Sequence, residues 1–225
     1  MAAGRMLETW AEQRRRQWGE KSAVYQNHVM GEFAAQDEQS VIPLAWVNAA
    51  IERWHELRQD EAWKVPLGPL TAVSLDVADG GEDRSIMARR HGLVVLPLED
   101  VTQAEPHATM ALVGLVWGAV EVSRARAIVD SIGVGAGAVS RLRELGADVV
   151  AFNAGAGTSR RDESGETGFL NQRAAAWWAF RQRLHPETGD NIALPNDAEL
   201  LADLAAPTYV LGTRGIQVES KPDIV

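Results

Sequence analysis

The sequence predicts an α/β fold with a mixed sheet, in which three antiparallel strands are followed by alternating helices and strands. The first observation is a block of short apolar runs, separated by turn signals, over residues 70–98. The second is the change after residue 107 to helical patterns that alternate with short apolar runs. The third is that two of these runs end in a carboxylate, at Asp76 and at Asp130.

Each element has a local signal. The strand at 70–77 is an apolar run, and the next two strands, at 84–90 and 93–98, form a hairpin that turns at His91-Gly92. A helix is expected at 107–122, a strand at 126–130, a helix at 136–145 closed by Gly146, and a strand at 148–153. The remaining elements are a helix at 170–184, a short strand at 191–194, a helix at 197–204 capped by Asn196 or Asp197, and a hairpin of 209–211 with 215–219. This is the element order of the ribonuclease H-like fold.

Residues 1–65 are expected to form a helical appendage or linker. Helical patterns cover 1–18 and 44–57, and the second of these places Trp46, Val47, Ala50, Ile51 and Trp54 on one face. The run Pro66-Leu-Gly-Pro69 marks a boundary. The main domain is therefore expected to cover residues 66–225.

The composition narrows the class of protein. The chain has 225 residues, of which 46% are hydrophobic and 24% charged, as in ordinary globular proteins. It contains no cysteine, which excludes disulfides and thiol nucleophiles. The longest apolar stretch, 110–120, is too short to span a membrane, so no membrane association and a cytoplasmic location are expected. The net charge of −9 argues against a protein whose whole surface binds nucleic acid, but it allows a narrow basic groove.

Asp76 and Asp130 are the candidate catalytic and metal-binding residues. A carboxylate at the end of a buried strand is held by a rigid scaffold, which suits a metal site. If the two strands lie side by side, both carboxylates can bind the same divalent ions. This hypothesis describes a metal-dependent domain that cleaves phosphodiester bonds.

A dinucleotide-binding site is the competing interpretation. Residues 130–138 (DSIGVGAGA) also match a strand–GxGxxA–helix pattern, in which glycines let the backbone approach a pyrophosphate. Asn153 stands where a ribose-binding acid is expected, and the pattern follows a three-strand block instead of opening a domain. A nucleotide-binding oxidoreductase is therefore the weaker alternative, and the glycines also fit simple close packing of helix and strand.

An ordered set of segments resembles the C-terminal nuclease domain of the large terminase subunit of tailed bacteriophages. The segments are 29–33 (VMGEF), 75–85 (LDVADGGEDRS), 129–137 (VDSIGVGAG), 169–178 (FLNQRAAAWW), 192–197 (IALPND) and 216–221 (IQVESK). The resemblance implies an endonuclease that cuts double-stranded viral DNA during packaging with two Mg²⁺ or Mn²⁺ ions. It also implies the bacterial host cytoplasm as location, and the terminase small subunit and the portal protein as partners. Asp76 and Asp130 match the first two metal-binding aspartates of that family.

Two departures from the family pattern open a further alternative. No GxxxxGK[ST] loop occurs, so ATP-driven packaging by this chain is not supported, and residues 1–65 resemble only the end of the ATPase region. The family's third metal-binding aspartate follows the Glu-Ser-Lys strand, whereas this chain stops at Val225, so the domain is expected to be truncated. Asp83 and Glu219 are the candidate substitutes. The alternative function is a catalytically inactive fragment that acts only as an interaction module.

Two arginines are candidate DNA contacts. Arg173 and Arg181 lie in the expected helix 170–184, which also carries Trp177-Trp178. They are placed to line a DNA groove, and a helix that buries its tryptophans and exposes its arginines explains the same pattern.

Overall fold

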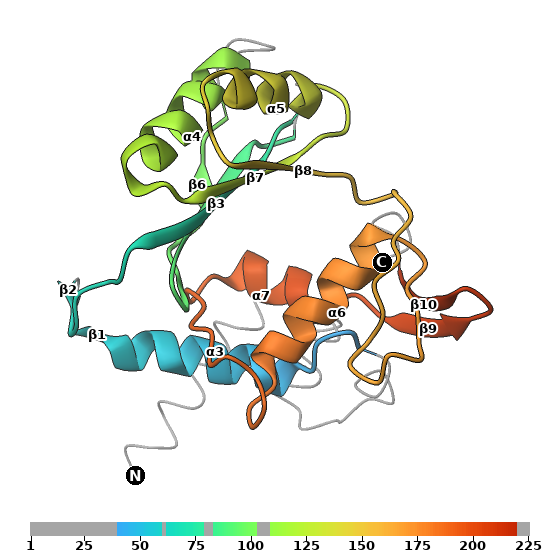
Figure 1. The fold of residues 1–225 in the computed structure, drawn as a ribbon. Helices are drawn as coiled ribbons and strands as arrows, with labels where there is room; N and C mark the ends of the chain where they lie inside the picture. Colours follow the sequence, from blue (N-terminus) through green and yellow to red (C-terminus); the bar gives the residue numbers. More distant parts are fainter. Residues whose placement is uncertain (1–39, 60–61, 79–82, 103–108, 220–225) are drawn as a thin grey trace.

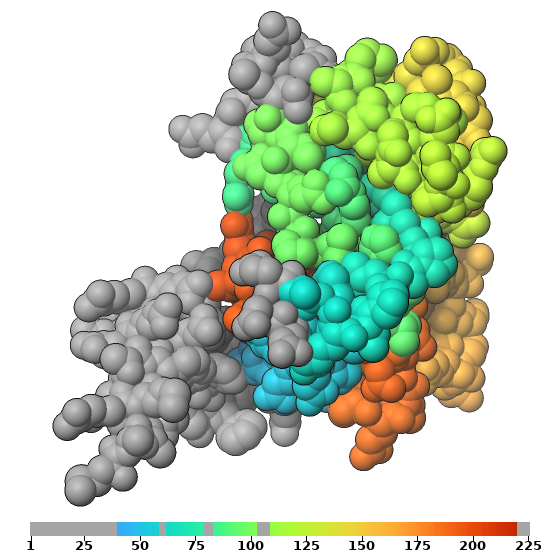
Figure 2. Space-filling view, turned by 90° about the vertical axis from the view of Figure 1, so that its left-hand side faces the viewer, coloured from blue at the N-terminus to red at the C-terminus, as the bar shows by residue number. Residues whose placement is uncertain are grey.

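The structure is a computed structural model that describes residues 40–59, 62–78, 83–102 and 109–219. The helix expected at 1–18 lies outside this range. Figure 1 shows two parts: the large sheet with helices along one side, and below it a group of helices with a hairpin beside them. Figure 2 shows from another side that residues coloured green to yellow lie above those coloured blue and orange.

The large sheet has the mixed topology that the sequence predicts. Its order is β5-β4-β3-β7-β8, and β6 pairs with the first residues of β4, Ile86 and Met87. β4 runs antiparallel to both β3 and β5, whereas β7 runs parallel to both β3 and β8. The predicted ribonuclease H-like order is therefore confirmed. The strands are β3 (Leu70–Asp76), β4 (Ile86–His91), β5 (Val94–Val95), β6 (Glu99–Asp100), β7 (Arg126–Asp130) and β8 (Val149–Phe152).

One face of this sheet carries the first core. Side chains alternate along a strand, so Val73, Leu75 and Val129 point to the same side, where they are buried. The helices α4 (Thr109–Ser123) and α5 (Gly135–Glu144) cover them. The intervening residues, Asp76 and Asp130 among them, therefore belong to the opposite face. None of the helices in the described part of the chain has both the length and the apolar character needed to cross a membrane.

A second core joins segments that are far apart in sequence. It contains Ile42 and Val47 from the region of α3 (Leu44–Leu57), Leu184 from α6 (Gln172–Leu184), and Leu201 from α7 (Ala198–Ala205). The helix predicted at 44–57 is observed with the same bounds. It packs against α6 and α7. The domain boundary expected near residue 65 stays a prediction.

The remaining strands form two small hairpins. β1 (Arg58–Gln59) pairs with β2 (Ala62–Trp63), and β9 (Tyr209–Gly212) pairs with β10 (Gly215–Val218), both antiparallel. The second hairpin is the one that the sequence predicts at the end of the chain. It packs against α6 through Trp178, whose ring lies 5.0 Å from that of Tyr209.

Two expected strands differ from the structure for local reasons. The strand expected at 93–98 is interrupted, because Pro97 has no amide hydrogen to donate to a sheet, and the pairing resumes at β6. The strand expected at 191–194 is a single bridge between Ala193 and Val94. Asn191 adopts a positive φ of 58° and Pro195 follows, so an extended run cannot form there.

We expect the second core to contribute strongly to stability. Leu184 is fully buried, so Leu184→Ala should lower the free energy of unfolding by about 2–5 kcal/mol, through lost burial and the cavity left behind. The matched control is Leu211→Ala, because Leu211 is 72% exposed and should change stability by less than about 0.5 kcal/mol. Urea unfolding of the two variants measures both values. Equal midpoints would contradict this account of the core.

Candidate metal centre at the sheet edge

The structure brings Asp76 and Asp130 together. The parallel pairing of β3 with β7 aligns Leu75 with Val129, and each aspartate is the next residue of its strand. Neighbouring strands lie roughly 4.8 Å apart, so the two aspartates are neighbours at the end of the sheet, and both belong to the same face. Both residues lie at the carboxyl ends of parallel strands, which is where α/β sheets place their ligand sites. Asp76 is exposed and Asp130 half-buried.

The turn after β7 holds the Asp130 carboxylate in place. Its Oδ1 accepts a hydrogen bond from the backbone amide of Ile132 at 2.9 Å. Ser131 ties the same turn to β8, since its amide and its hydroxyl both donate to the carbonyl of Phe152, at 2.8 and 3.0 Å. The carboxylate therefore projects from a turn that is anchored to two strands.

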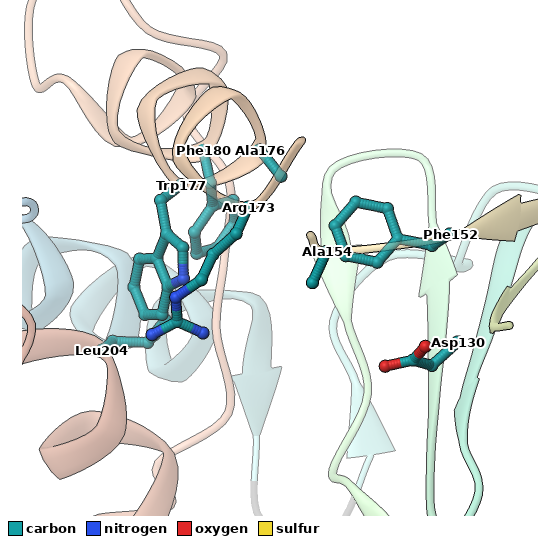
Figure 3. A pocket seen from close by; sticks show the side chains of 8 residues that line it. All are labelled: Asp130, Phe152, Ala154, Arg173, Ala176, Trp177, Phe180 and Leu204. Atoms are coloured by element: carbon teal, nitrogen blue, oxygen red, sulfur yellow. The ribbon is translucent and has the colours of Figure 1, made fainter. Parts of the chain in front are cut away.

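A cavity of about 320 Å³ lies beside Asp130, between the sheet and the helices α6 and α7. Figure 3 shows Asp130 and Phe152 on the sheet side, facing a group of side chains from α6. The α6 residues follow the spacing i, i+3, i+4, i+7 that defines one helix face. The complete lining is Asp130, Phe152, Ala154, Arg173, Ala176, Trp177, Phe180 and Leu204.

Arg173 brings a positive charge to the cavity. Its Nε and Nη2 donate to the carbonyl oxygen of Glu219 at 3.3 and 2.9 Å, and its guanidinium carbon lies 5.8 Å from the ring centre of Trp177. Burial lowers the pKa of Arg173, but an arginine stays charged at neutral pH. The guanidinium lies across the cavity from the Asp130 carboxylate (Figure 3).

Arg181, the other candidate DNA contact, is held by aromatic rings and backbone carbonyl oxygens. Its guanidinium lies 4.9 Å from the ring centre of Trp46 and 5.1 Å from that of Trp178. Nη1 donates to the carbonyl oxygens of Ser40 and Val41, and burial lowers the pKa of the group. Arg181 thus connects α6 to the start of α3 and does not line the cavity.

The two candidate substitutes for a third ligand are placed differently. The carboxylate of Glu219 accepts from the hydroxyl and the amide of Thr208, at 2.9 and 3.2 Å, and does not line the cavity. Asp83 is exposed, directly after the segment 79–82 that the structure does not describe. Within the described ranges, no group of three or more His, Asp or Glu side chains is arranged to hold a metal ion. The metal-binding roles of Asp83 and Glu219 stay predictions.

The glycine-rich turn after β7 is explained by close packing. A Cβ on Gly135 would lie 1.8 Å from the carbonyl oxygen of Asp130, so only glycine lets α5 start at this point. Asn153, at the position of the expected ribose-binding acid, accepts hydrogen bonds from the amides of Gly155 and Ala156 and so stabilises a turn. The three antiparallel strands beyond β7 also differ from the mostly parallel sheet of dinucleotide-binding domains.

Sequence reasoning did not find the aromatic lining of the cavity. The signal was present in α6, where Arg173, Ala176, Trp177 and Phe180 share one face. A helix that packs between two neighbours shows the same pattern, however, and indeed Trp178 packs against the closing hairpin. Only the placement of α6 opposite Asp130 separates the two roles.

The glycines offer a matched pair of substitutions. Gly135→Ala should force β7 and α5 apart and lower the free energy of unfolding by about 1–3 kcal/mol. Gly137→Ala is two positions along the same helix and meets no atom within 4 Å, so it should stabilise the protein by roughly 0.5–1 kcal/mol. Urea unfolding distinguishes the two. If Gly135→Ala were as stable as Gly137→Ala, the close approach at Asp130 would be wrong.

A scan against protein-family models finds no match, and a sequence search of curated proteins finds none either. Solved structures do match. A mutant nuclease domain of the large terminase subunit gp2 of bacterial virus Sf6, with manganese and β-thujaplicinol, has a TM-score of 0.60 and 21% identity, covering 80% of this chain and 88% of that one. A mutant of the same subunit with calcium has a TM-score of 0.60 and 22% identity, over 82% and 89% of the two chains. The Sf6 nuclease domain itself has a TM-score of 0.59 and 23% identity, over 81% and 89%. The chain therefore has the fold of a phage terminase nuclease domain.

Proposed function

We propose that this protein is a metal-dependent DNA endonuclease, equivalent to the nuclease domain of a phage terminase large subunit. One observation carries the proposal: the parallel pairing of β3 with β7 places Asp76 and Asp130 next to each other at the carboxyl edge of a ribonuclease H-like sheet. The likeness in fold to the Sf6 domain, one structure of which is described with manganese, supports it.

The donor set fits a hard divalent cation. Mg²⁺ and Mn²⁺ prefer carboxylate oxygens and keep several waters, so a pair of aspartates at a sheet edge suits either ion. When bound, such ions generate hydroxide and stabilise the attacking and leaving oxygens at phosphorus. Asp76 and Asp130 would hold them, with further ligands from water and from the bound phosphate.

The surrounding residues have supporting roles. The amide of Ile132 orients the Asp130 carboxylate directly, and Ser131 anchors the same turn to β8. Arg173 adds a fixed positive charge opposite it, which favours the approach of a phosphate to a protein with a net charge of −9. Cleavage of double-stranded viral DNA during packaging is the specific substrate and setting that we propose. Docking to the terminase small subunit and to the portal protein stays a prediction of the family resemblance.

An inactive interaction module is the second candidate function. It is favoured by the observation that only two carboxylates meet at the sheet edge in the described part of the chain. Asp79, Glu82 and Asp223 lie outside that part. Calorimetric titration separates the two candidates: binding of Mn²⁺ at millimolar or lower concentration supports the nuclease, and no binding supports the module.

The nuclease proposal predicts that both aspartates are indispensable. With Mn²⁺, the protein should nick supercoiled plasmid. Asp76→Asn or Asp130→Asn should lower the rate by more than about 100-fold, because removing a residue that binds the metal costs more than removing a residue that only supports a metal ligand. The measurement is the loss of supercoiled DNA with time on a gel.

Asp148→Asn is the matched control. Asp148 is exposed, pairs with Arg126 at 2.9 Å, and precedes β8 at the opposite end of the sheet. This variant should nick plasmid at the wild-type rate. Nicking that survived both Asp76→Asn and Asp130→Asn would assign the activity to another site or to a contaminant.

A further inference from the structure

We propose that the cavity beside Asp130 binds one unstacked nucleobase of the DNA strand that is being cut. This inference rests on the proposed nuclease function and names a substrate contact that the chemistry at phosphorus does not require. Hydrolysis needs only the backbone to reach the metal. A cavity next to the Asp130 carboxylate, lined in part by aromatic rings, offers a place for a further contact with the substrate.

The walls are suited to a flat aromatic group. Phe152 contributes a ring from the sheet side, and Trp177 and Phe180 contribute rings from α6 (Figure 3). Stacking on aromatic side chains is how proteins bind single-stranded nucleic acid without reading its sequence, since every base has a π-face. The cavity of about 320 Å³ is in the size range of pockets that take small molecules.

The polar groups at the cavity fit the charges of a nucleotide. A base in a strand is flanked by two phosphates. Asp130, with the cation that it would hold, lies on one side of the cavity, and the Arg173 guanidinium lies on the other. One nucleotide unit can thus place its base between the rings, one phosphate at the metal and the next near Arg173. An apolar peptide side chain would satisfy the rings and leave both charged groups unused.

The cavity is built before any ligand arrives. Phe152 is the direct register partner of Asp130, so the two side chains start from neighbouring positions on the same face of the sheet. Trp177 and Phe180 pack against the second core, and Asn171 caps α6 by accepting from the amide of Ala174 at 2.9 Å. Binding would require little rearrangement of the protein. The DNA, by contrast, must unstack a base, which is easiest in a frayed, mismatched or single-stranded region.

The test compares two labelled single strands of about eight nucleotides, within the site sizes of single-strand binders. One carries thymine at each position and the other carries abasic sugars on the same backbone, and fluorescence anisotropy with Ca²⁺ measures their dissociation constants. The wild type should bind the thymine strand about 5- to 100-fold more tightly. Trp177→Ala and Phe152→Ala should bind it only as tightly as the abasic strand, whereas Trp177→Phe should keep most of the preference.

Trp63→Ala is the matched control, because Trp63 meets Trp54 edge to face, with ring centres 5.4 Å apart, in the β1–β2 region and does not line the cavity. It should keep the wild-type preference. Equal affinity of the wild type for both strands would overturn the base pocket. An equal loss for both strands in Trp177→Ala and in Trp177→Phe would also overturn it, since that result indicates a purely structural role.

The test distinguishes a failure of the base pocket from a failure of the nuclease proposal. A thymine preference in a protein that nicks no DNA with Mn²⁺ would support the pocket and contradict the endonuclease. Nicking that depends on Asp130, without any thymine preference, would support the endonuclease and contradict the pocket.

Discussion

The parallel pairing of β3 with β7 is the interaction on which the whole site depends. It is maintained from the opposite face of the sheet, where Val73, Leu75, Ala127 and Val129 are buried under α4 and α5. A shift of one residue between the strands would turn one aspartate toward that apolar core and leave the other on the open face. Burying a carboxylate without a partner is strongly unfavourable, so the core itself selects the register that brings the carboxylates together.

The second requirement is that the open face of the sheet meets a helix that belongs to a different core. α6 is fixed by the core that it shares with α3 and α7, and a few contacts connect this core to the sheet. Ala193 exchanges backbone hydrogen bonds with Leu93 and Val95, at 2.9 and 3.0 Å, and the Trp54 indole donates to the carbonyl of Val95 at 3.0 Å. These contacts lie at the edge of the sheet formed by β5. On the other side, the segment after β8 reaches the start of α6, where the amides of Gln172 and Arg173 donate to the carbonyl oxygens of Ala156 and Ala154 at 2.8 and 2.9 Å. The two parts are thus joined on both sides of the cavity that lies between Asp130 and α6.

Much of this arrangement could be predicted from local sequence patterns. The bounds of α3 and β7 match the expected ranges, and the order of strands follows from apolar runs separated by turns. The paired aspartates could be predicted because parallel strands deliver their ends to one edge. The different roles of the two arginines could not be predicted, because Arg173 and Arg181 lie in the same helix and have the same side chain. Arg181 is held between Trp46 and Trp178, a contact with a residue 135 positions away that no local pattern encodes. The same holds for the cavity, whose walls come from β7, β8, α6 and α7.

The central claim is that Asp76 and Asp130 bind the same metal site. Crystals of the protein soaked in Mn²⁺, with diffraction data collected near the manganese absorption edge, test it most directly. The account predicts an anomalous density peak between the two carboxylates, with oxygens of both side chains at distances ordinary for metal coordination, and the loss of that peak in Asp130→Asn. A peak bound by only one of the two aspartates, or manganese bound elsewhere while both carboxylates stay free of it, would contradict the claim.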